Sequence, residues 1–274
     1  MNRRKGFVVT VAIGAMCALT AGAVSAQNGN AQGANSQNGS QSSACKDLPS
    51  QSALRAALVD ATHAMNGGFG LNMWATVVNR DGVVCAVAFT GNNRGDQWPG
   101  SRVISAQKAN TANAFSLPAV ALSTANLYTA VQPGGSLFGL QESNPVNVDV
   151  AYGGNPSNYG QPNDPMVGGR IGGVNVFGGG LALYNSNGQI VGAVGVSGDT
   201  SCADHNIAWR TRNLLNDDFV PHTAFNASGD PTHPDNIVYD ITPQAGQMPG
   251  VSAGGWGHPK CGRGEDGISL PAVK

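Results

Sequence analysis

The chain has 274 residues, of which 41% are hydrophobic and only 11% carry a charged side chain. Its 15 basic and 16 acidic residues nearly cancel, and the sequence holds no basic cluster, which argues against nucleic acid or an anionic membrane surface as a partner. The 39 glycines predict a loop-rich protein whose backbone segments pack closely.

The first part of the chain has the pattern of a secretory signal. Basic residues 3–5 precede an apolar stretch at 7–23, and a Val-Ser-Ala cleavage site ends at Ala26. We therefore expect residues 1–26 to be removed on export, so that the protein is periplasmic or secreted and keeps no membrane segment. Their removal lowers the formal charge from −1 to −4.

Composition divides the remaining chain into three parts. Residues 27–44 are rich in Gln, Asn, Ser and Gly and predict a disordered linker. Residues 45–215 have the composition of a folded domain, and residues 216–274 form a loop-rich C-terminal extension that we expect to pack on it.

The domain begins with a helix and a hairpin. Apolar residues at helical spacing predict a helix over residues 52–65. Strands at 73–78 and 83–89 follow, joined by an Asn-Arg-Asp-Gly turn. The second strand is apolar on both faces, which predicts a central position in the sheet.

Two further helices and a long irregular segment come next. The pattern predicts helices over 101–115, capped by Ser101, and over 118–131. Residues 132–173 are rich in Gly, Pro and Asn and predict a long functional or wrapping loop. A short strand at 174–177 is expected after it.

A second hairpin and a last helix complete the domain. Strands at 181–184 and 189–196 flank an Asn-Ser-Asn-Gly turn, and a helix is expected over 201–215. Hairpins give antiparallel pairing, so the element order predicts an α+β fold with a central antiparallel sheet built from two hairpins and flanked by helices.

Four cysteines remain after loss of the signal: Cys45, Cys85, Cys202 and Cys261. In an exported chain they indicate two disulfides, for which three pairings are possible. We favour Cys202–Cys261 and Cys45–Cys85, because the first would tie a Gly/Pro-rich tail to a helix start. No Cys-x-x-Cys is present, which argues against a zinc site and against covalent haem attachment.

The segment from Gly192 to His205 is the most informative part of the chain. A strand of small residues leads through a Gly/Ser turn into a helix, which would place free N–H groups and a helix N-terminus together. This pattern predicts an anion-binding site, with the candidate residues Gly195, Ser197, Gly198, Thr200 and Ser201. Tight packing between strand and helix, which also needs glycine, is the alternative interpretation.

Several motifs, in this order, resemble one known family. They are Thr76–Gly82, Ser105–Ala112, Gly178–Leu181, Gly192–Gly198 and Asp204. Together they resemble the GlcG/HbpS-type haem-binding family over roughly residues 54–215. The long segment 132–173, the cysteines, the tail and Asn79, where Asp is common, depart from the family pattern.

The resemblance implies an antiparallel sheet with helices, self-association and, in some members, haem binding. On this interpretation Lys108 would pair with a haem propionate, or would organise the end of the sheet. Thr111 lies on the same motif, where we favour a structural role because a hydroxyl is a poor iron ligand. His205 would be an axial iron ligand or a surface histidine.

We therefore expect an exported, non-catalytic protein that binds haem or a related small ligand and forms homo-oligomers through the sheet edge or the 132–173 loop. An enzyme or enzyme accessory acting on a small organic acid is the second hypothesis, and a structural module without ligand is the third. A serine hydrolase is disfavoured, because Asp199 stands where a nucleophile elbow around Ser197 requires glycine.

Overall fold

The computed structural model describes residues 43–274, so the predicted signal and almost all of the predicted linker lie outside the described residues. Its centre is a four-stranded sheet in the order β2-β1-β4-β3, in which every neighbouring pair is antiparallel. The strands are β1 (Trp74–Asn79), β2 (Val84–Phe89), β3 (Gly180–Tyr184) and β4 (Ile190–Ser197). The predicted α+β fold with two hairpins is confirmed.

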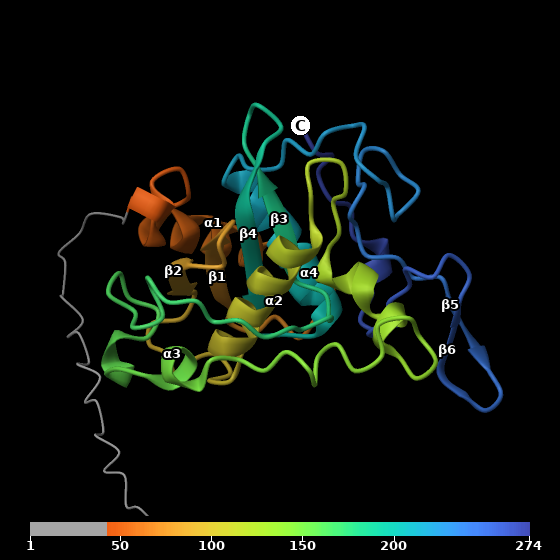
Figure 1. Ribbon diagram of the computed structural model, residues 1–274, viewed down its shortest axis with the longest axis horizontal. Helices are drawn as coiled ribbons and strands as arrows, with labels where there is room; N and C mark the ends of the chain where they lie inside the picture. The colour runs from red at the N-terminus through yellow and green to blue at the C-terminus, as the bar shows by residue number, and fades with distance from the viewer. Residues whose placement is uncertain (1–42) are drawn as a thin grey trace, which may run out of the picture. The chain divides into compact units, whose positions relative to one another are not determined.

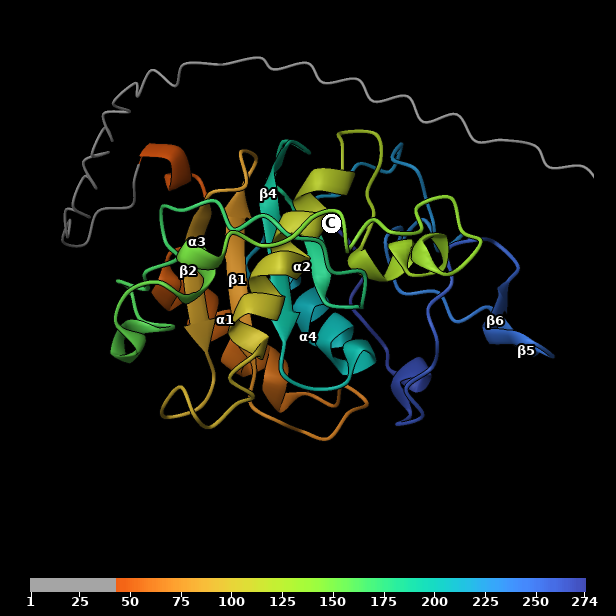
Figure 2. The same ribbon diagram turned by 60° about the horizontal axis from the view of Figure 1, so that its bottom comes forward.

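Helices cover both faces of the sheet (Figure 1). Helix α2 (Ser101–Phe115) crosses one face, while α1 (Gln51–His63) and α4 (Ser201–Leu214) pack together on the other (Figure 2). Each face buries its own apolar cluster, so the strands are apolar on both sides. The predicted cap of α2 is wrong. Ser101 is the first residue inside the helix, and the residue at the cap position, Gly100, has no side chain that could accept a hydrogen bond.

Strand β2 corrects one prediction. It is buried on both faces, as expected, but it lies at an edge of the sheet and not at its centre. A bulge where Val78 pairs with Val84 and Val77 pairs with Ala86 leaves Cys85 unpaired and moves the following side chains to the opposite faces. The alternation of side chains between the two faces, which is all that the sequence offers, does not reveal such an inserted residue.

Both sheet edges are covered by other parts of the same chain. At β2, the backbone of Val84 exchanges hydrogen bonds of 2.9 Å with Gly168 and Gly169 from the long loop. At β3, the backbone of Tyr184 bonds with Asp217 and Phe219. We expected the sheet edge to contribute to self-association. This arrangement conflicts with that expectation, because the backbone N–H and C=O groups of Val84 and Tyr184 are already hydrogen-bonded within the chain.

Two predicted elements are wrong. Residues 118–131 form the short 3-10 helices η2 (Thr124–Leu127) and η3 (Thr129–Val131) and not one α-helix. The side chains of Ser123 and Asn126 bond each other and the local backbone, which competes with a longer helix. Residues 174–177 are not a strand, because Asn175 N donates to the Thr111 hydroxyl on α2 and not to a neighbouring strand.

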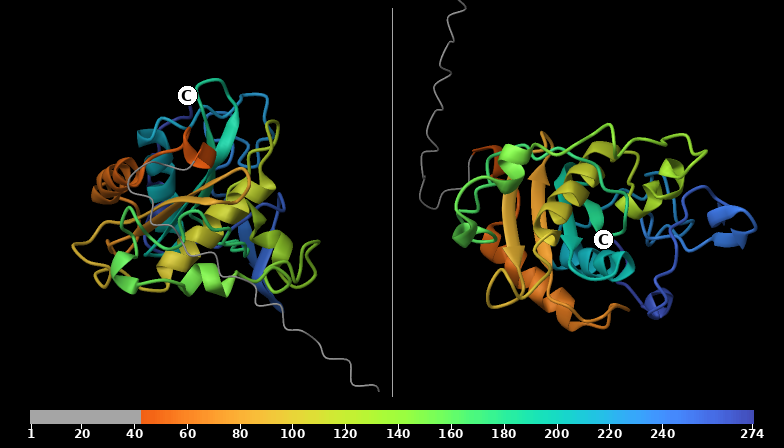
Figure 3. Two further views of the ribbon diagram at one scale, coloured as in Figure 1. Left: turned by 60° about the vertical axis from the view of Figure 1, so that its left-hand side comes forward. Right: turned by 90° about the horizontal axis from the view of Figure 1, so that it is seen from below.

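The long loop and the tail contain some regular structure of their own. The loop holds α3 (Val148–Tyr152) and the 3-10 helix η4 (Pro156–Asn158). The tail holds a hairpin of β5 (Ile241–Gln244) and β6 (Gln247–Ser252), which projects at the side of the molecule in Figure 3, and the 3-10 helix η5 (Glu265–Gly267). The prediction that these segments consist mostly of loop is otherwise in agreement with the structure.

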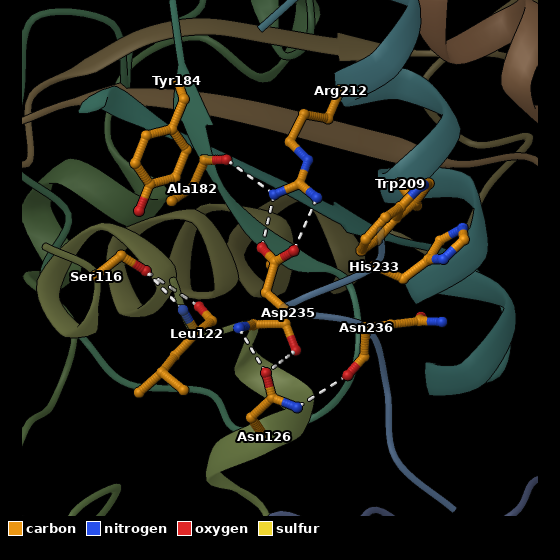
Figure 4. Close-up of polar contacts among 12 residues, drawn as sticks. Ser116, Leu122, Asn126, Ala182, Tyr184, Trp209, Arg212, His233, Asp235 and Asn236 are labelled. Carbon is orange, nitrogen blue, oxygen red and sulfur yellow. Dashed lines mark hydrogen bonds and ion pairs between the residues drawn. The ribbon is translucent and has the colours of Figure 1, made fainter. Parts of the chain in front are cut away.

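Buried ion pairs attach both segments to the domain. Arg102 on α2 pairs with Asp164 of the long loop and stacks on Tyr159 at 3.6 Å. Arg212 on α4 donates to both oxygens of Asp235 in the tail, at 2.6 and 2.9 Å (Figure 4). Each pair is buried, so each joins its segment to the core through a contact that cannot be released without exposing an unpaired charge.

Two disulfides join the described cysteines in the pairing that we favoured. Cys45 is bonded to Cys85 on β2, and Cys202 on α4 is bonded to Cys261 in the tail. The second bond and the Arg212–Asp235 pair therefore hold the tail against the same helix.

Candidate functional site

The turn between β4 and α4 carries its own anion. The carboxylate oxygen Oδ1 of Asp204 accepts hydrogen bonds from the backbone N–H groups of Gly198 (3.1 Å) and Asp199 (2.9 Å). Thr200 caps α4 by accepting from Ala203 N. The donors that the sequence offered for an external anion thus have an acceptor inside the chain.

Lys108 meets the same carboxylate from α2. Its ammonium lies 2.7 Å from Asp204 Oδ2 and also donates to the carbonyl of Val196 at 3.2 Å. Both charged groups are buried. Burial raises the pKa of Asp204 to about 6, and the charge of Lys108 opposes that shift. Of the two roles considered for Lys108, the geometry matches the organisation of the sheet end.

Gly195 serves close packing between sheet and helix. A Cβ atom at this position would lie 2.0 Å from the carbonyl oxygen of Ser105 and 2.4 Å from the backbone nitrogen of Ala109, both on α2. The alternative reading of this glycine, as a packing residue, is the one that the contacts match. Thr111 is also buried on α2, where its hydroxyl donates to Gln107 O and accepts from Asn175 N.

Ser197 and Ser201 lie at the two ends of the turn. Ser197 is buried at the end of β4, opposite Trp74 of β1. The Ser201 hydroxyl lies 3.6 Å from Cys261 Sγ, beside the disulfide. The predicted residues are therefore brought together in space, but the hydroxyls of Thr200 and Ser201 and the N–H group of Gly198 face neighbours in the chain.

His205 is completely buried in the interior of the protein. Its Nε2 atom lies 3.0 Å from Asn236 Oδ1 and 3.1 Å from Ile237 N, while Nδ1 has no partner among residues 43–274. Burial lowers the pKa of His205 to about 3, against the opposite effects of Asp235 and Asn236. The imidazole is neutral, as an iron ligand must be. However, residues 236–237 of the tail separate it from any open site.

One group of described residues has the composition of a metal site: Cys202, Cys261 and Glu265, whose donor atoms lie within 4.8 Å of one another. The two sulfur atoms are bonded to each other, so neither is a thiolate ligand. The Glu265 carboxylate accepts from the backbone N–H groups of Cys261, Gly262 and Arg263. The group therefore builds a turn and offers no free ligand set.

An open pocket of about 500 Å³ lies beside the turn between β4 and α4. Its walls come from the segment after α1, from α4 and from the tail. Its apolar lining includes Met65, Phe69, Leu71, Ile207 and Ile268. Its volume is within the range of about 300–1,000 Å³ that small-molecule sites have. Met65 is 84% exposed and Phe69 is also exposed, so large apolar side chains face solvent at its mouth.

The pocket also has charged groups of both signs. Asp199 lines it, but its carboxylate accepts from the N–H groups of Phe69 (2.8 Å) and Leu71 (3.1 Å). Arg263 from the tail lines it as well, with its guanidinium 4.2 Å from the Phe69 ring centroid. The carboxylate of Asp199 is bonded to the backbone of the pocket wall, whereas the guanidinium of Arg263 lies on the surface.

The sequence pointed to only one side of this site. The predicted segment contributes Asp199 and Ala203, but the residues after α1 and in the tail were not predicted. The Asn66-Gly67-Gly68 run and Gly70 were available as signals, since Gly67 and Gly70 adopt φ values of +71° and +72° that allow an unusual loop. The favoured Cys202–Cys261 disulfide placed the tail beside the start of α4, but nothing in the sequence indicated that Arg263 itself lines a pocket there.

Comparison with known proteins gives one family and several weak structural likenesses. A family model described as "Haem degrading protein HbpS-like" matches residues 49–212. No curated protein matches the chain. Among residues 43–274, no helix combines the length and the apolar character that crossing a bilayer requires.

The solved structures that are similar share little sequence with the chain. A PduOC–haem complex is 22% identical and covers 60% of this chain and 91% of its own, with a TM-score of 0.41. The protein ORFY of Klebsiella pneumoniae is 25% identical and covers 66% and 95%, with a TM-score of 0.40. A crystal structure of HbpS is 16% identical and covers 68% and 97%, with a TM-score of 0.38.

Proposed function

The chain belongs to the HbpS-like family of haem-degrading proteins, and from this premise we propose that it binds haem in the pocket beside the β4–α4 turn. The observation that carries the proposal is the combination of an apolar lining with one surface cation. A flat apolar macrocycle with carboxylate groups needs both: apolar walls to bury it and a cation for its acid groups.

The residues present fit such a ligand. Phe69, Leu71 and Ile268 would pack against the macrocycle. Met65 would offer the iron a thioether, which is a known type of haem ligand, at the mouth of the pocket. No histidine lines the pocket within the described residues, so Met65 replaces His205 as the proposed iron ligand. Haem bound here would supply a redox-active iron that the side chains of the pocket lack.

We propose further that the protein is exported, binds haem without consuming it and forms homo-oligomers. The predicted export signal at residues 1–26 and the two disulfides support an oxidising compartment. Since both sheet edges are covered at Val84 and Tyr184, self-association would use helix or loop surfaces.

A haemin titration of the mature protein tests the function. We expect a saturable change of the Soret band near one haem per chain, and a weaker affinity in Phe69→Ala. Phe138→Ala removes an exposed aromatic ring that does not line the pocket and is the matched control. A titration of the wild-type protein without saturation would refute the proposal.

The same complex distinguishes binding from degradation. After a reductant is added under air, we expect the Soret band to persist for hours, because the proposal is a binding protein. Decay of the band with formation of a ring-opened product, absent from a haemin solution without protein, would show that the chain degrades haem.

A further inference from the structure

One wall of the pocket comes from outside the part of the chain that matches the family. The family model ends at residue 212, whereas Arg263, Gly264 and Ile268 of the tail line the pocket. The remaining walls, formed by residues 62–71 and α4, lie inside the match. The tail therefore adds a side to the site that the family domain alone does not build.

The added wall is firmly attached to the domain. Cys261, two residues before Arg263, is bonded to Cys202 on α4. The Glu265 carboxylate holds the backbone of the same turn, including Arg263 N at 2.7 Å. Asn206 on α4 donates to the carbonyls of Asn66 (3.0 Å) and Glu265 (3.4 Å), and so joins the two walls of the pocket.

The guanidinium of Arg263 is the available cation of this site. It is exposed and stacks on Phe69, and within residues 43–274 it makes no ion pair or side-chain hydrogen bond. The nearby carboxylates of Asp199 and Glu265 are each engaged by backbone N–H groups. Lys108, the cation that the sequence suggested for a propionate, is buried against Asp204.

We propose that Arg263 is the specificity-determining residue of the pocket, and that it pairs with a carboxylate of the ligand. A guanidinium has a planar fork of donors that matches a carboxylate, and stacking on Phe69 keeps that fork oriented at the pocket. The extension thus selects tetrapyrroles with free acid groups over neutral ones. This inference rests on the proposed haem function and assigns ligand choice to the tail.

The test compares two ligands and two variants. Wild type, Arg263→Gln and the control Arg170→Gln are titrated with haemin and with haemin dimethyl ester, whose acid groups are blocked. Arg170 is exposed and bonds the carbonyl of Asp81, at the turn between β1 and β2, so its loss removes the same charge elsewhere. Circular dichroism and the unfolding midpoint confirm that each variant is folded.

We expect Arg263→Gln to weaken haemin binding by about tenfold or more, as for other hydrogen bonds to charged groups. The affinity for the ester should be the same in all three proteins. Haemin affinity unchanged in a folded Arg263→Gln, or an equal loss for both ligands, would overturn the role of Arg263 while leaving haem binding intact. A wild type that binds neither ligand would overturn the proposed function, and with it this inference.

Discussion

The ammonium of Lys108 and the carboxylate of Asp204 form a buried ion pair with 2.7 Å between Nζ and Oδ2. The pair connects α2, on one face of the sheet, with α4, on the other. Since the second oxygen of Asp204 receives the N–H groups of Gly198 and Asp199, one carboxylate organises the turn, the helix start and the neighbouring helix together.

Replacement of Lys108 should destabilise the fold strongly. Lys108→Met leaves the Asp204 charge buried without a cation, so we expect the free energy of unfolding to fall by about 3–5 kcal/mol. Urea unfolding followed by circular dichroism measures it. Lys260→Met breaks the exposed pair with Asp266 and should have little effect. Equal effects of the two substitutions would contradict an organising role for the buried pair.

Gly195 should not tolerate even a methyl group. The Cβ of Gly195→Ala would meet backbone atoms of Ser105 and Ala109, so α2 must move away from the sheet. We expect a loss of about 1–3 kcal/mol, as for other overpacked sites. Gly267→Ala, where no atom lies within 4 Å of the added Cβ, is the control. A thermal midpoint for Gly195→Ala equal to that of this control would disprove the packing role.

The two disulfides should have different effects on ligand binding. Each disulfide closes a long loop in the unfolded chain. The chain-entropy model therefore predicts that removing either one lowers the free energy of unfolding by roughly 4 kcal/mol. Only the double variant Cys202→Ala with Cys261→Ala releases the wall that carries Arg263, so only this variant should also lower haemin affinity. The double variant Cys45→Ala with Cys85→Ala is the matched control. The prediction fails if both double variants, at a temperature where both are folded, bind haemin equally.

The spectrum of bound haem should depend on Met65 and not on His205. Met65→Ala removes the thioether at the mouth of the pocket, and we expect the Soret maximum to shift. His205→Ala changes a ring enclosed by Asn236 and Ile237, so the maximum should stay in place. Absorbance spectra of the ferric complexes measure both. A shift in His205→Ala alone would restore the histidine as ligand.

Acid should weaken the fold through His258. Burial lowers the pKa of His258 to about 4, below the ordinary value of 6.5, and its ring packs in one cluster with the rings of Tyr128 and Phe177. The unfolded chain therefore takes up a proton at a pH where the folded chain does not. The stability that this histidine contributes is complete above pH 6.5 and declines by about 1.4 kcal/mol per unit as pH falls from 6.5 toward 4.

Asp204, whose pKa is raised to about 6, acts with the opposite sign between pH 6 and its ordinary pKa near 3.8. The effect of His258 is therefore measured as the difference in the free energy of unfolding between the wild type and His258→Gln. The free energy of unfolding against pH should be flatter below pH 6.5 in His258→Gln than in the wild type. His63→Gln changes an exposed histidine and should follow the wild type. Parallel curves for wild type and His258→Gln would rule out this linkage.

Local pattern was sufficient for the main elements because they depend on neighbouring residues. Apolar spacing located α1 to within two residues, and the turn residues at 79–82 and 185–188 located both hairpins. The pattern failed over residues 118–131, where Ser123 and Asn126 satisfy the backbone in another way. It failed again at β2, where a bulge and a covering loop cannot be detected from alternation.

The candidate site divides in the same way. The sequence by itself determined the turn before α4, since its glycines, Thr200 and Asp204 act on backbone groups a few residues away. It also carried the family motifs and the cysteines. Only the tertiary structure decided that Lys108 fills the turn from another helix, that His205 is closed off, and that Arg263 reaches the pocket. The Lys108–Asp204 contact spans 96 residues and the His205–Asn236 contact spans 31, and the chain must fold before such distant groups can meet.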